Sequence, residues 1–241
     1  MGYPVTWFEV NGPEPTKASA FYAELFGWHT KPLPDANYTL IDTHSGSGIN
    51  GGIGETRQGQ PAHGIIYVEG PDIQALLDKA ESMGATTVVP RTASMNVTFA
   101  QFNDPFGNLV GLVEGDGSTA VSEGSNPRVN WFEISSTEPK ASWDFYRELF
   151  GWEIEESSGD GYLHGEVNTG QGIPGGIGSS QSGHPTSQVD AEVDDLQKHV
   201  ERAESLGGTI AVQPMSVGEE TSIALFLDPQ GTLFGLYVHQ H

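Results

Sequence analysis

Apolar side chains recur at helical spacing in four stretches of the chain, around 18–26, 73–80, 142–150 and 196–203. Gly27 and Gly151 stand where the first and third of these helices would end, and Asp72 is a plausible N-cap for the second. The positions behind this prediction, all apolar except Ser142, are Ala18, Phe21, Tyr22, Leu25 and Phe26; Ile73, Leu76, Leu77 and Ala80; Ser142, Phe145, Tyr146, Leu149 and Phe150; and Leu196, Val200 and Ala203.

Segments with strand-like patterns fill most of the remaining chain. In the first half they lie at about 5–10, 37–43, 62–69, 95–102 and 108–114, and the second half has their equivalents. Each half then reads as two β-α-β-β-β units, which makes four units in all. The prediction is an α+β fold with mixed sheets whose helices cover one face.

The second half of the chain repeats the first. Trp7-Phe8-Glu9-Val10 returns as Trp131-Phe132-Glu133-Ile134, an offset of 124 residues, and Asp104-Pro105-Phe106-Gly107 returns at the same offset as Asp228-Pro229-Gln230-Gly231. A small, polar, turn-prone segment separates the two copies. We therefore expect one domain at 1–114, a linker at 115–127 and a second domain at 128–241.

Composition narrows the classes of function. The formal net charge is −22, from 32 acidic and 10 basic residues, so nucleic acid and anionic membranes are poor partners. The chain has no cysteine, which excludes disulfides, thiolate metal ligands and a cysteine nucleophile. It shows no leader-like N-terminus and no apolar run long enough for a membrane span. We expect a cytoplasmic protein, a monomer with an internal pseudo-dimer or a homodimer.

Two motifs resemble those of a known family. Phe-Tyr-x-x-Leu-Phe-Gly-Trp ends the first helix of each repeat, and Asp-Pro-x-Gly precedes each last strand. In this the chain resembles the vicinal oxygen chelate superfamily, which includes glyoxalase I, bleomycin-resistance proteins and extradiol dioxygenases, and it looks most like two-domain bacterial glyoxalase-like proteins. The resemblance implies tandem domains built of four βαβββ units. Their mixed sheets would curve, with helices on the convex face and the ligand on the concave face.

The family's usual metal ligands are missing from both repeats. Metal-dependent members place ligands on the first strand, in the middle of the domain and on the last strand. The matching positions here hold Trp7 and Trp131, Ile65 and Gln188, and Gly111 and Gly235. Tryptophan and glycine side chains do not bind metals. We therefore expect no cofactor, with a divalent metal in an unusual site as the less favoured alternative.

Strand alternation selects the candidate site residues. If Phe8 and Val10 face the helices, then Trp7 and Glu9 face the cavity, and the same parity applies to later strands. A histidine with a nearby carboxylate could act as an acid–base pair. The predicted catalytic residues are His63, His164 and Glu133. The predicted ligand-binding residues are Trp7, Glu9, Tyr67, Trp131, Tyr162, Gln188 and Asp190.

Two hypotheses about function follow. In the first, the protein binds a small organic molecule in aromatic-walled cavities, as bleomycin-resistance proteins do, and does not transform it. In the second, it is an enzyme of the same superfamily, of lyase, isomerase or oxygenase type, with a metal-free or unusual-metal acid–base site. A binder could use both cavities alike, whereas an enzyme would concentrate polar groups in one of them.

Overall fold

The structure is a computed structural model that describes residues 2–94, 97–115, 120–157, 162–217 and 220–239. Contacts within the chain divide it into two compact units. Unit 1 comprises 1–7, 65–119 and 131–187, and unit 2 comprises 8–64, 120–130 and 188–241, so each unit draws on both repeats. The domain boundaries expected from the repeat stay a prediction, and residues 116–119 of the expected linker lie outside the described residues.

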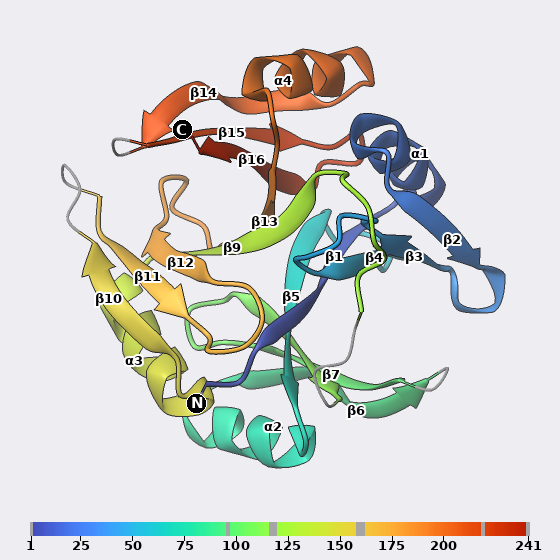
Figure 1. Ribbon diagram of the computed structural model, residues 1–241. Coiled ribbons are helices and arrows are strands. Elements are labelled where there is room, and N and C mark those ends of the chain that lie inside the picture. Colours follow the sequence, from blue (N-terminus) through green and yellow to red (C-terminus); the bar gives the residue numbers. More distant parts are fainter. Residues whose placement is uncertain (1, 95–96, 116–119, 158–161, 218–219, 240–241) are drawn as a thin grey trace. The chain divides into compact units, whose positions relative to one another are not determined.

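Each repeat runs through the same order of elements (Figure 1). The first repeat consists of β1 (Val5–Gly12), α1 (Pro15–Phe26), β2 (His29–Leu33), the short 3-10 helix η1 (Pro34–Ala36), β3 (Tyr38–Asp42), β4 (Asn50–Glu55), β5 (His63–Gly70), α2 (Ile73–Ser82), β6 (Thr86–Ser94), β7 (Val97–Asn103) and β8 (Leu109–Glu114). The second repeat consists of β9 (Arg128–Ser136), α3 (Pro139–Phe150), β10 (Glu153–Ser157), β11 (His164–Asn168), β12 (Gly175–Ser179), β13 (Thr186–Glu192), α4 (Leu196–Ser205), β14 (Thr209–Val217), β15 (Thr221–Leu227) and β16 (Leu233–His239).

The strands form two eight-stranded sheets with the same strand order. One sheet runs β2-β3-β4-β1-β5-β8-β7-β6, and the other runs β10-β11-β12-β9-β13-β16-β15-β14. Both sheets are mixed, since β5 pairs with β8 and β13 with β16 in parallel while the outer strands pair antiparallel. The predicted α+β fold of four βαβββ units with curved mixed sheets is confirmed. Strands β2, β4 and β6 complete the units, although no segment predicted above matches them.

The four predicted helices are confirmed, with their buried faces as expected. The buried residues of α1, α2 and α4 are those that the helical spacing selects, and α3 buries Trp143 in addition. Gly27 and Gly151 end α1 and α3 in the left-handed conformation, with φ of 75° and 68°. The Asp72 side chain accepts a hydrogen bond from the Ala75 amide and so caps α2.

Aromatic side chains of the first helix in each repeat pack against strands of the other repeat. In unit 2, the Phe21 and Phe226 ring centroids lie 5.6 Å apart, and those of Tyr22 and Phe234 lie 5.3 Å apart. In unit 1, the Phe102 and Phe145 centroids lie 6.4 Å apart. The apolar faces of α1 and α3 are thus buried by residues that lie far from them in the sequence.

The alternation predicted for the first strand of each repeat is confirmed. Phe8 and Phe132 are fully buried, and each packs against the tryptophan that follows the first helix, Trp28 or Trp152. Their neighbours in sequence, which point to the opposite face, are only half-buried. Trp7, Glu9, Trp131 and Glu133 therefore lie on the face that the parity argument assigns to the cavity.

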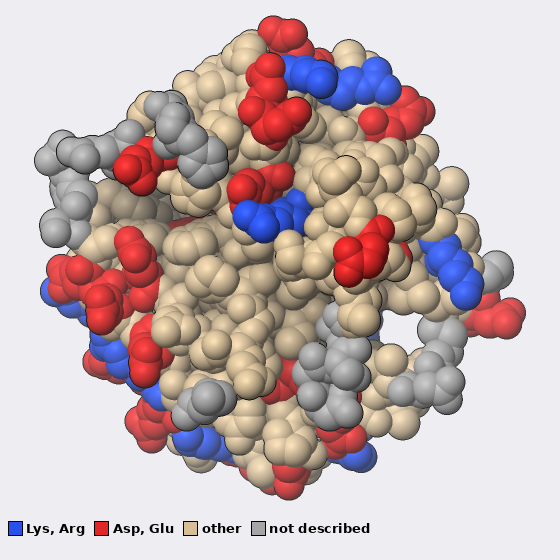
Figure 2. Space-filling model, viewed as in Figure 1, with Lys and Arg blue, Asp and Glu red and all other residues tan. Residues whose placement is uncertain are grey.

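The chain carries 32 acidic and 10 basic residues. No described helix is long and apolar enough to cross a membrane. Figure 2 shows Asp and Glu side chains spread over the visible face, with fewer Lys and Arg among them. No single acidic tail accounts for the charge.

Candidate functional site

A histidine and a glutamate form a hydrogen-bonded pair in unit 1. His164, the first residue of β11, brings its Nε2 to 3.0 Å from Glu133 Oε1 and 3.3 Å from Oε2. Glu133 lies on β9. The two side chains are only 19% and 17% exposed, so their charges interact in a partly desolvated setting. The structure thus brings together two of the three predicted catalytic residues.

Three neighbouring side chains, those of Trp131, Ser157 and Tyr162, contact this pair. The indole Nε1 of Trp131 donates to Glu133 Oε2 at 3.2 Å, and the Ser157 hydroxyl lies 3.1 Å from His164 Nδ1. The Tyr162 ring stacks on the imidazole with centroids 5.9 Å apart. Because both imidazole nitrogens are engaged, the ring orientation is fixed. Five residues, Ser157, Tyr162, His164, Glu133 and Trp131, form what we call the His164–Glu133 cluster.

Glycines on the neighbouring strand β12 make room for the cluster. Gly176 pairs with Glu133 in the parallel β9–β12 ladder and with Glu166 in the β11–β12 ladder. A Cβ atom added to Gly176 would lie 2.2 Å from His164 Nε2 and 2.3 Å from Glu133 Oε2, and one added to Gly178 would lie 2.1 Å from the Tyr162 hydroxyl. Gly176 and Gly178, which match Gly52 and Gly54 of the first repeat, therefore provide space for polar side chains to lie on the sheet.

Electrostatics favour a proton on the imidazole. Burial disfavours the imidazolium, but the hydrogen bond and charge of Glu133, together with the charge of Glu166, outweigh it and raise the pKa of His164. Burial, with a smaller contribution from Glu133, raises the pKa of Tyr162 to about 12, so the phenol stays protonated. The cluster therefore combines a carboxylate, an imidazole that readily carries a proton and a neutral phenol donor.

The first repeat holds a different cluster at the equivalent place, in unit 2. The Tyr38 hydroxyl donates to Glu9 Oε1 at 2.9 Å, and Asn11 Nδ2 donates to Glu9 Oε2 at 3.1 Å. The equivalence comes from the strand register, because Tyr38 pairs with Gly54 as His164 pairs with Gly178. A phenol thus occupies the place of the imidazole, and the three residues Glu9, Tyr38 and Asn11 include no histidine.

Aligning the two repeats at the constant offset of 124 residues does not reveal that His164 and Tyr38 occupy equivalent places. His164 lies thirteen positions after Gly151, whereas Tyr38 lies eleven positions after Gly27, and the next loop is shorter by the same amount. At the constant offset, His164 would match Leu40 instead. Comparing the spacing from the helix-ending glycine to the next strand would have revealed the shift.

Three predicted ligand-binding residues on the central strands are buried. In unit 1, Tyr67 is 4% exposed and lies over Gly111. In unit 2, Gln188 Nε2 donates to Asp190 Oδ1 at 3.0 Å. Both side chains are buried, and Asp190 lies over Gly235.

The two remaining predicted residues, Trp7 and His63, lie on β1 and β5. The half-buried Trp7 lies on β1. His63 begins β5, and its Nδ1 lies 3.0 Å from the carbonyl oxygen of Pro61. Within the described residues, no carboxylate lies within ion-pair distance of His63, so the acid–base pair that we considered for it does not form.

A further polar network in unit 2 joins Glu192, which strand alternation places on the cavity face, to three residues that the sequence analysis did not select. Glu192 Oε2 accepts hydrogen bonds from Arg128, Asn130 and Tyr237 at 2.8, 2.9 and 3.1 Å. Burial opposes ionisation of Glu192, but these donors outweigh it and lower its pKa. Tyr237 lies two residues after Gly235 on the same face of β16, so extending the alternation to the last strand would have found it.

The residues at the family's metal positions do not fit the usual ligand set. A Cβ atom at Gly235 would lie 1.9 Å from Asp190 Oδ1, and one at Gly111 would lie 2.3 Å from the Tyr67 ring. The space that a last-strand glutamate would fill is therefore occupied by other side chains. In the described part of the chain, no three His, Asp or Glu side chains are grouped so that they could hold a metal ion.

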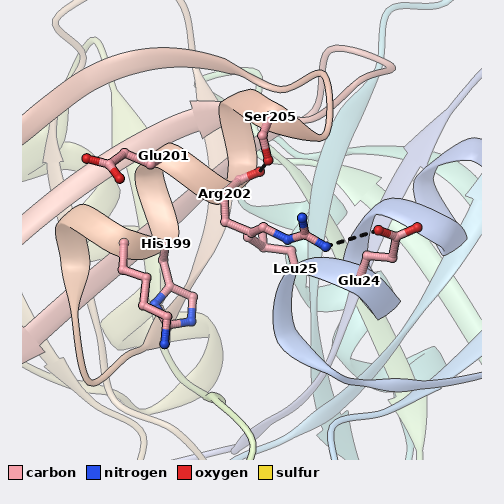
Figure 3. A pocket seen from close by; sticks show the side chains of 7 residues that line it. Glu24, Leu25, His199, Glu201, Arg202 and Ser205 are labelled. Carbon is pink, nitrogen blue, oxygen red and sulfur yellow. Dashed lines mark hydrogen bonds and ion pairs between the residues drawn. The ribbon is translucent and has the colours of Figure 1, made fainter.

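A separate hollow of about 450 Å³ lies in unit 2 between α1 and α4 (Figure 3). It is an open surface groove, and Arg202 spans it to reach Glu24 at 3.1 Å. Its lining residues are Glu24, Leu25, Lys198, His199, Glu201, Arg202 and Ser205. None of them is a residue that the sequence analysis selected for the site.

Curated relatives match one part of the chain. The anthracycline biosynthesis protein DnrV of Streptomyces peucetius is 30% identical over 124 residues, which are 44% of this chain and 45% of that protein. The anthracycline biosynthesis protein DauV of Streptomyces sp. (strain C5) is 29% identical over the same shares. The match thus spans less than half the length of these relatives.

Solved structures match the whole fold. The Mn(II)-bound glyoxalase from Novosphingobium aromaticivorans has a TM-score of 0.72 at 14% identity, and covers 100% of this chain and 83% of its own. The 2,3-dioxygenase LapB from Pseudomonas sp. KL28 has a TM-score of 0.73 at 13% identity, with coverage of 100% and 94%. At such identities the likeness concerns the fold alone.

Two family models match in tandem. Residues 5–112 match the model described as glyoxalase/bleomycin resistance protein/dioxygenase superfamily, and residues 131–237 match the glyoxalase-like domain. With the two motifs, the paired βαβββ units and the structural neighbours, these matches show that the chain belongs to the glyoxalase/bleomycin resistance protein/dioxygenase, or vicinal oxygen chelate, superfamily, as two tandem domains.

Proposed function

We propose that the protein is an enzyme that binds a planar organic carbonyl compound and moves a proton within it at the His164–Glu133 cluster. One observation carries this proposal: the second repeat has a histidine–carboxylate pair where the first repeat has a tyrosine–carboxylate pair. A carboxylate held by an indole and an imidazole is positioned for general acid–base catalysis. The difference between the repeats favours an enzyme over a binder that uses both halves alike.

Each member of the cluster has a role in this proposal. Glu133 is the base that accepts a proton from a carbon next to the substrate carbonyl. His164 and Trp131 orient the carboxylate through the hydrogen bonds at 3.0 and 3.2 Å. The C–H electron pair moves into a new C=C bond, and the carbonyl electrons move to oxygen, so that an enolate forms. Return of a proton from Glu133 to carbon completes an isomerisation or exchange.

The substrate class follows from the aromatic surroundings and from the relatives. Tyr162, His164 and Trp131 present rings beside the carboxylate, and rings of this kind suit a flat ligand. The two curated relatives are named for anthracycline biosynthesis, and anthracyclines are polycyclic quinones. The usual metal positions are not filled by ligands, so we further propose that the proton transfer uses protein side chains alone.

The test is deuterium exchange into 2-tetralone, a bicyclic ketone with acidic benzylic hydrogens, followed by proton NMR in D2O. The wild-type protein should accelerate exchange over buffer, and Glu133→Gln should lose the acceleration. His164→Tyr, which installs the arrangement of the first repeat, should lower the rate by about 10²-fold, the scale of displacing a catalytic group, because Glu133 loses the imidazole that orients it.

Tyr38→Phe is the matched control. It removes the hydroxyl that donates a hydrogen bond to Glu9, and both of these residues lie in the first repeat. Its exchange rate should equal that of the wild type. If the wild type binds 2-tetralone but exchanges it no faster than buffer, the enzyme proposal is wrong and the binding hypothesis replaces it. If it neither binds nor exchanges 2-tetralone, the proposed substrate class is wrong.

A further inference from the structure

We infer that Tyr162 is the residue that recognises the substrate oxygen, donating its phenolic hydrogen to the oxygen that becomes negatively charged. This inference rests on the proposed function and adds a second reacting partner to the site. Nothing in the superfamily's metal-binding pattern assigns a role to this position. The usual metal would polarise that oxygen, and a neutral phenol beside a base offers a different means of doing so.

The hydroxyl of Tyr162 is able to donate a hydrogen bond to a bound ligand. The ring packs on His164, but within the described residues the hydroxyl makes no hydrogen bond. The hydroxyl lies directly above Gly178, whose missing side chain leaves it room. A half-buried donor without a partner gains a hydrogen bond when an acceptor oxygen enters the site.

The spacing of the two glycines sets the geometry. Glu133 Oε2 lies above Gly176 and the Tyr162 hydroxyl lies above Gly178, two residues farther along β12. Residues two apart on one strand are separated by roughly 7 Å, and their side chains leave the same face. A single carbonyl group with its neighbouring carbon fits between the two, with the oxygen toward Tyr162 and the acidic C–H toward Glu133.

The first repeat lacks this donor. By strand register, the position of Tyr162 corresponds to Ala36, two residues before Tyr38. The extra length before β11 in the second repeat therefore brings in both the imidazole and the phenol.

The test is Tyr162→Phe, which keeps the ring and removes only the hydroxyl. With 2-tetralone carrying ¹³C at the carbonyl, the bound wild-type protein should shift the carbonyl resonance downfield, as a hydrogen bond to oxygen does. Tyr162→Phe should abolish that shift and lower kcat for deuterium exchange by about 10²-fold, the scale of losing one such donor. Tyr38→Phe, the same change in the first repeat, should keep both.

The outcomes separate this inference from the proposed function. If Glu133→Gln loses exchange while Tyr162→Phe keeps the wild-type rate and carbonyl shift, the role of Tyr162 is wrong and the proposed function stands. If Glu133→Gln keeps exchange, the proposed function itself is wrong. A merely structural role for Tyr162 predicts lower thermal stability with an unchanged carbonyl shift, which would also overturn the inference.

Discussion

The Tyr146 hydroxyl donates a hydrogen bond of 2.8 Å to Asp104 Oδ2, and the two residues belong to different repeats. Tyr22 and Asp228 form the reciprocal bond at 3.2 Å. The tyrosine of the Phe-Tyr-x-x-Leu-Phe-Gly-Trp motif in one repeat is thus satisfied by the aspartate of the Asp-Pro-x-Gly motif in the other. Each bond lies within one compact unit, so the two motifs that identify the family meet at the cores of the units.

Removing these hydroxyls should destabilise the protein unequally. Tyr146→Phe leaves the buried Asp104 without one donor and should cost about 1.5–3 kcal/mol, the range for hydrogen bonds to charged groups. Tyr22→Phe should cost less, because its bond is longer. Urea unfolding of both variants checks this. An equal or larger loss for Tyr22→Phe would contradict the geometric argument.

His164 should titrate above its ordinary range in a way that depends on Glu133. Burial lowers its pKa and Glu133 raises it, with a net rise. Glu133→Gln removes the hydrogen bond and the charge of Glu133 and leaves only the charge of Glu166 to raise the pKa of His164, so that pKa should fall. NMR titration of the His164 ring measures both values. An unchanged pKa in Glu133→Gln would show that the pair is not electrostatically coupled.

The same pair should make stability depend on pH with a definite sign. A histidine whose pKa is raised in the folded state binds its proton more tightly than the unfolded chain does. The stabilisation is fully present below the unfolded pKa of about 6.5 and is lost as the pH rises through the folded pKa. Unfolding free energies of wild type and His164→Gln should therefore differ more at pH 5.5 than at pH 8.5. A difference that grows with pH would contradict this sign.

Gly176→Ala should disrupt the site sterically, although it removes no polar group. Its Cβ would overlap the His164–Glu133 contact, since the nearest atoms lie at 2.2 and 2.3 Å. We expect at least a 10-fold loss of exchange with 2-tetralone, the cost of displacing a positioned base by about 1 Å or more. Gly52→Ala is the control, because its Cβ would meet Tyr38 in the first repeat. Equal losses in both variants would argue against a single active cluster.

Removing metal should leave the proposed activity unchanged. Gly111 and Gly235 stand where the family uses a carboxylate, and Tyr67 and Asp190 fill the space above them. We expect no stoichiometric transition metal by elemental analysis, and equal exchange rates before and after treatment with EDTA. About one Mn, Fe, Ni or Zn per domain, with activity lost on chelation, would contradict the metal-free proposal.

The repeat, the four helices and the α+β class could all be predicted from local patterns in the amino-acid sequence. These depend on local patterns: helical spacing in 18–26, glycine after the last helical turn, and alternation around Phe8 and Phe132. An element with such a pattern has one apolar face, and that face is buried whichever neighbour the element packs against. Strand β4 (Asn50–Glu55) was not predicted, because its glycines have no side chains and therefore show no alternating pattern.

Contacts between residues far apart in the sequence depend on how the strands pair and the elements pack. Strand register, not the repeat offset, places His164 where the first repeat has Tyr38, because a loop longer by two residues shifts the chain along the sheet. Pairing of Tyr146 with Asp104 likewise depends on packing between segments 42 positions apart in the chain. Such contacts minimise buried unpaired polar groups over the whole fold, and no local pattern encodes them. Strand alternation selected His164 and Glu133 as candidates, and the fold brings their side chains to 3.0 Å from each other.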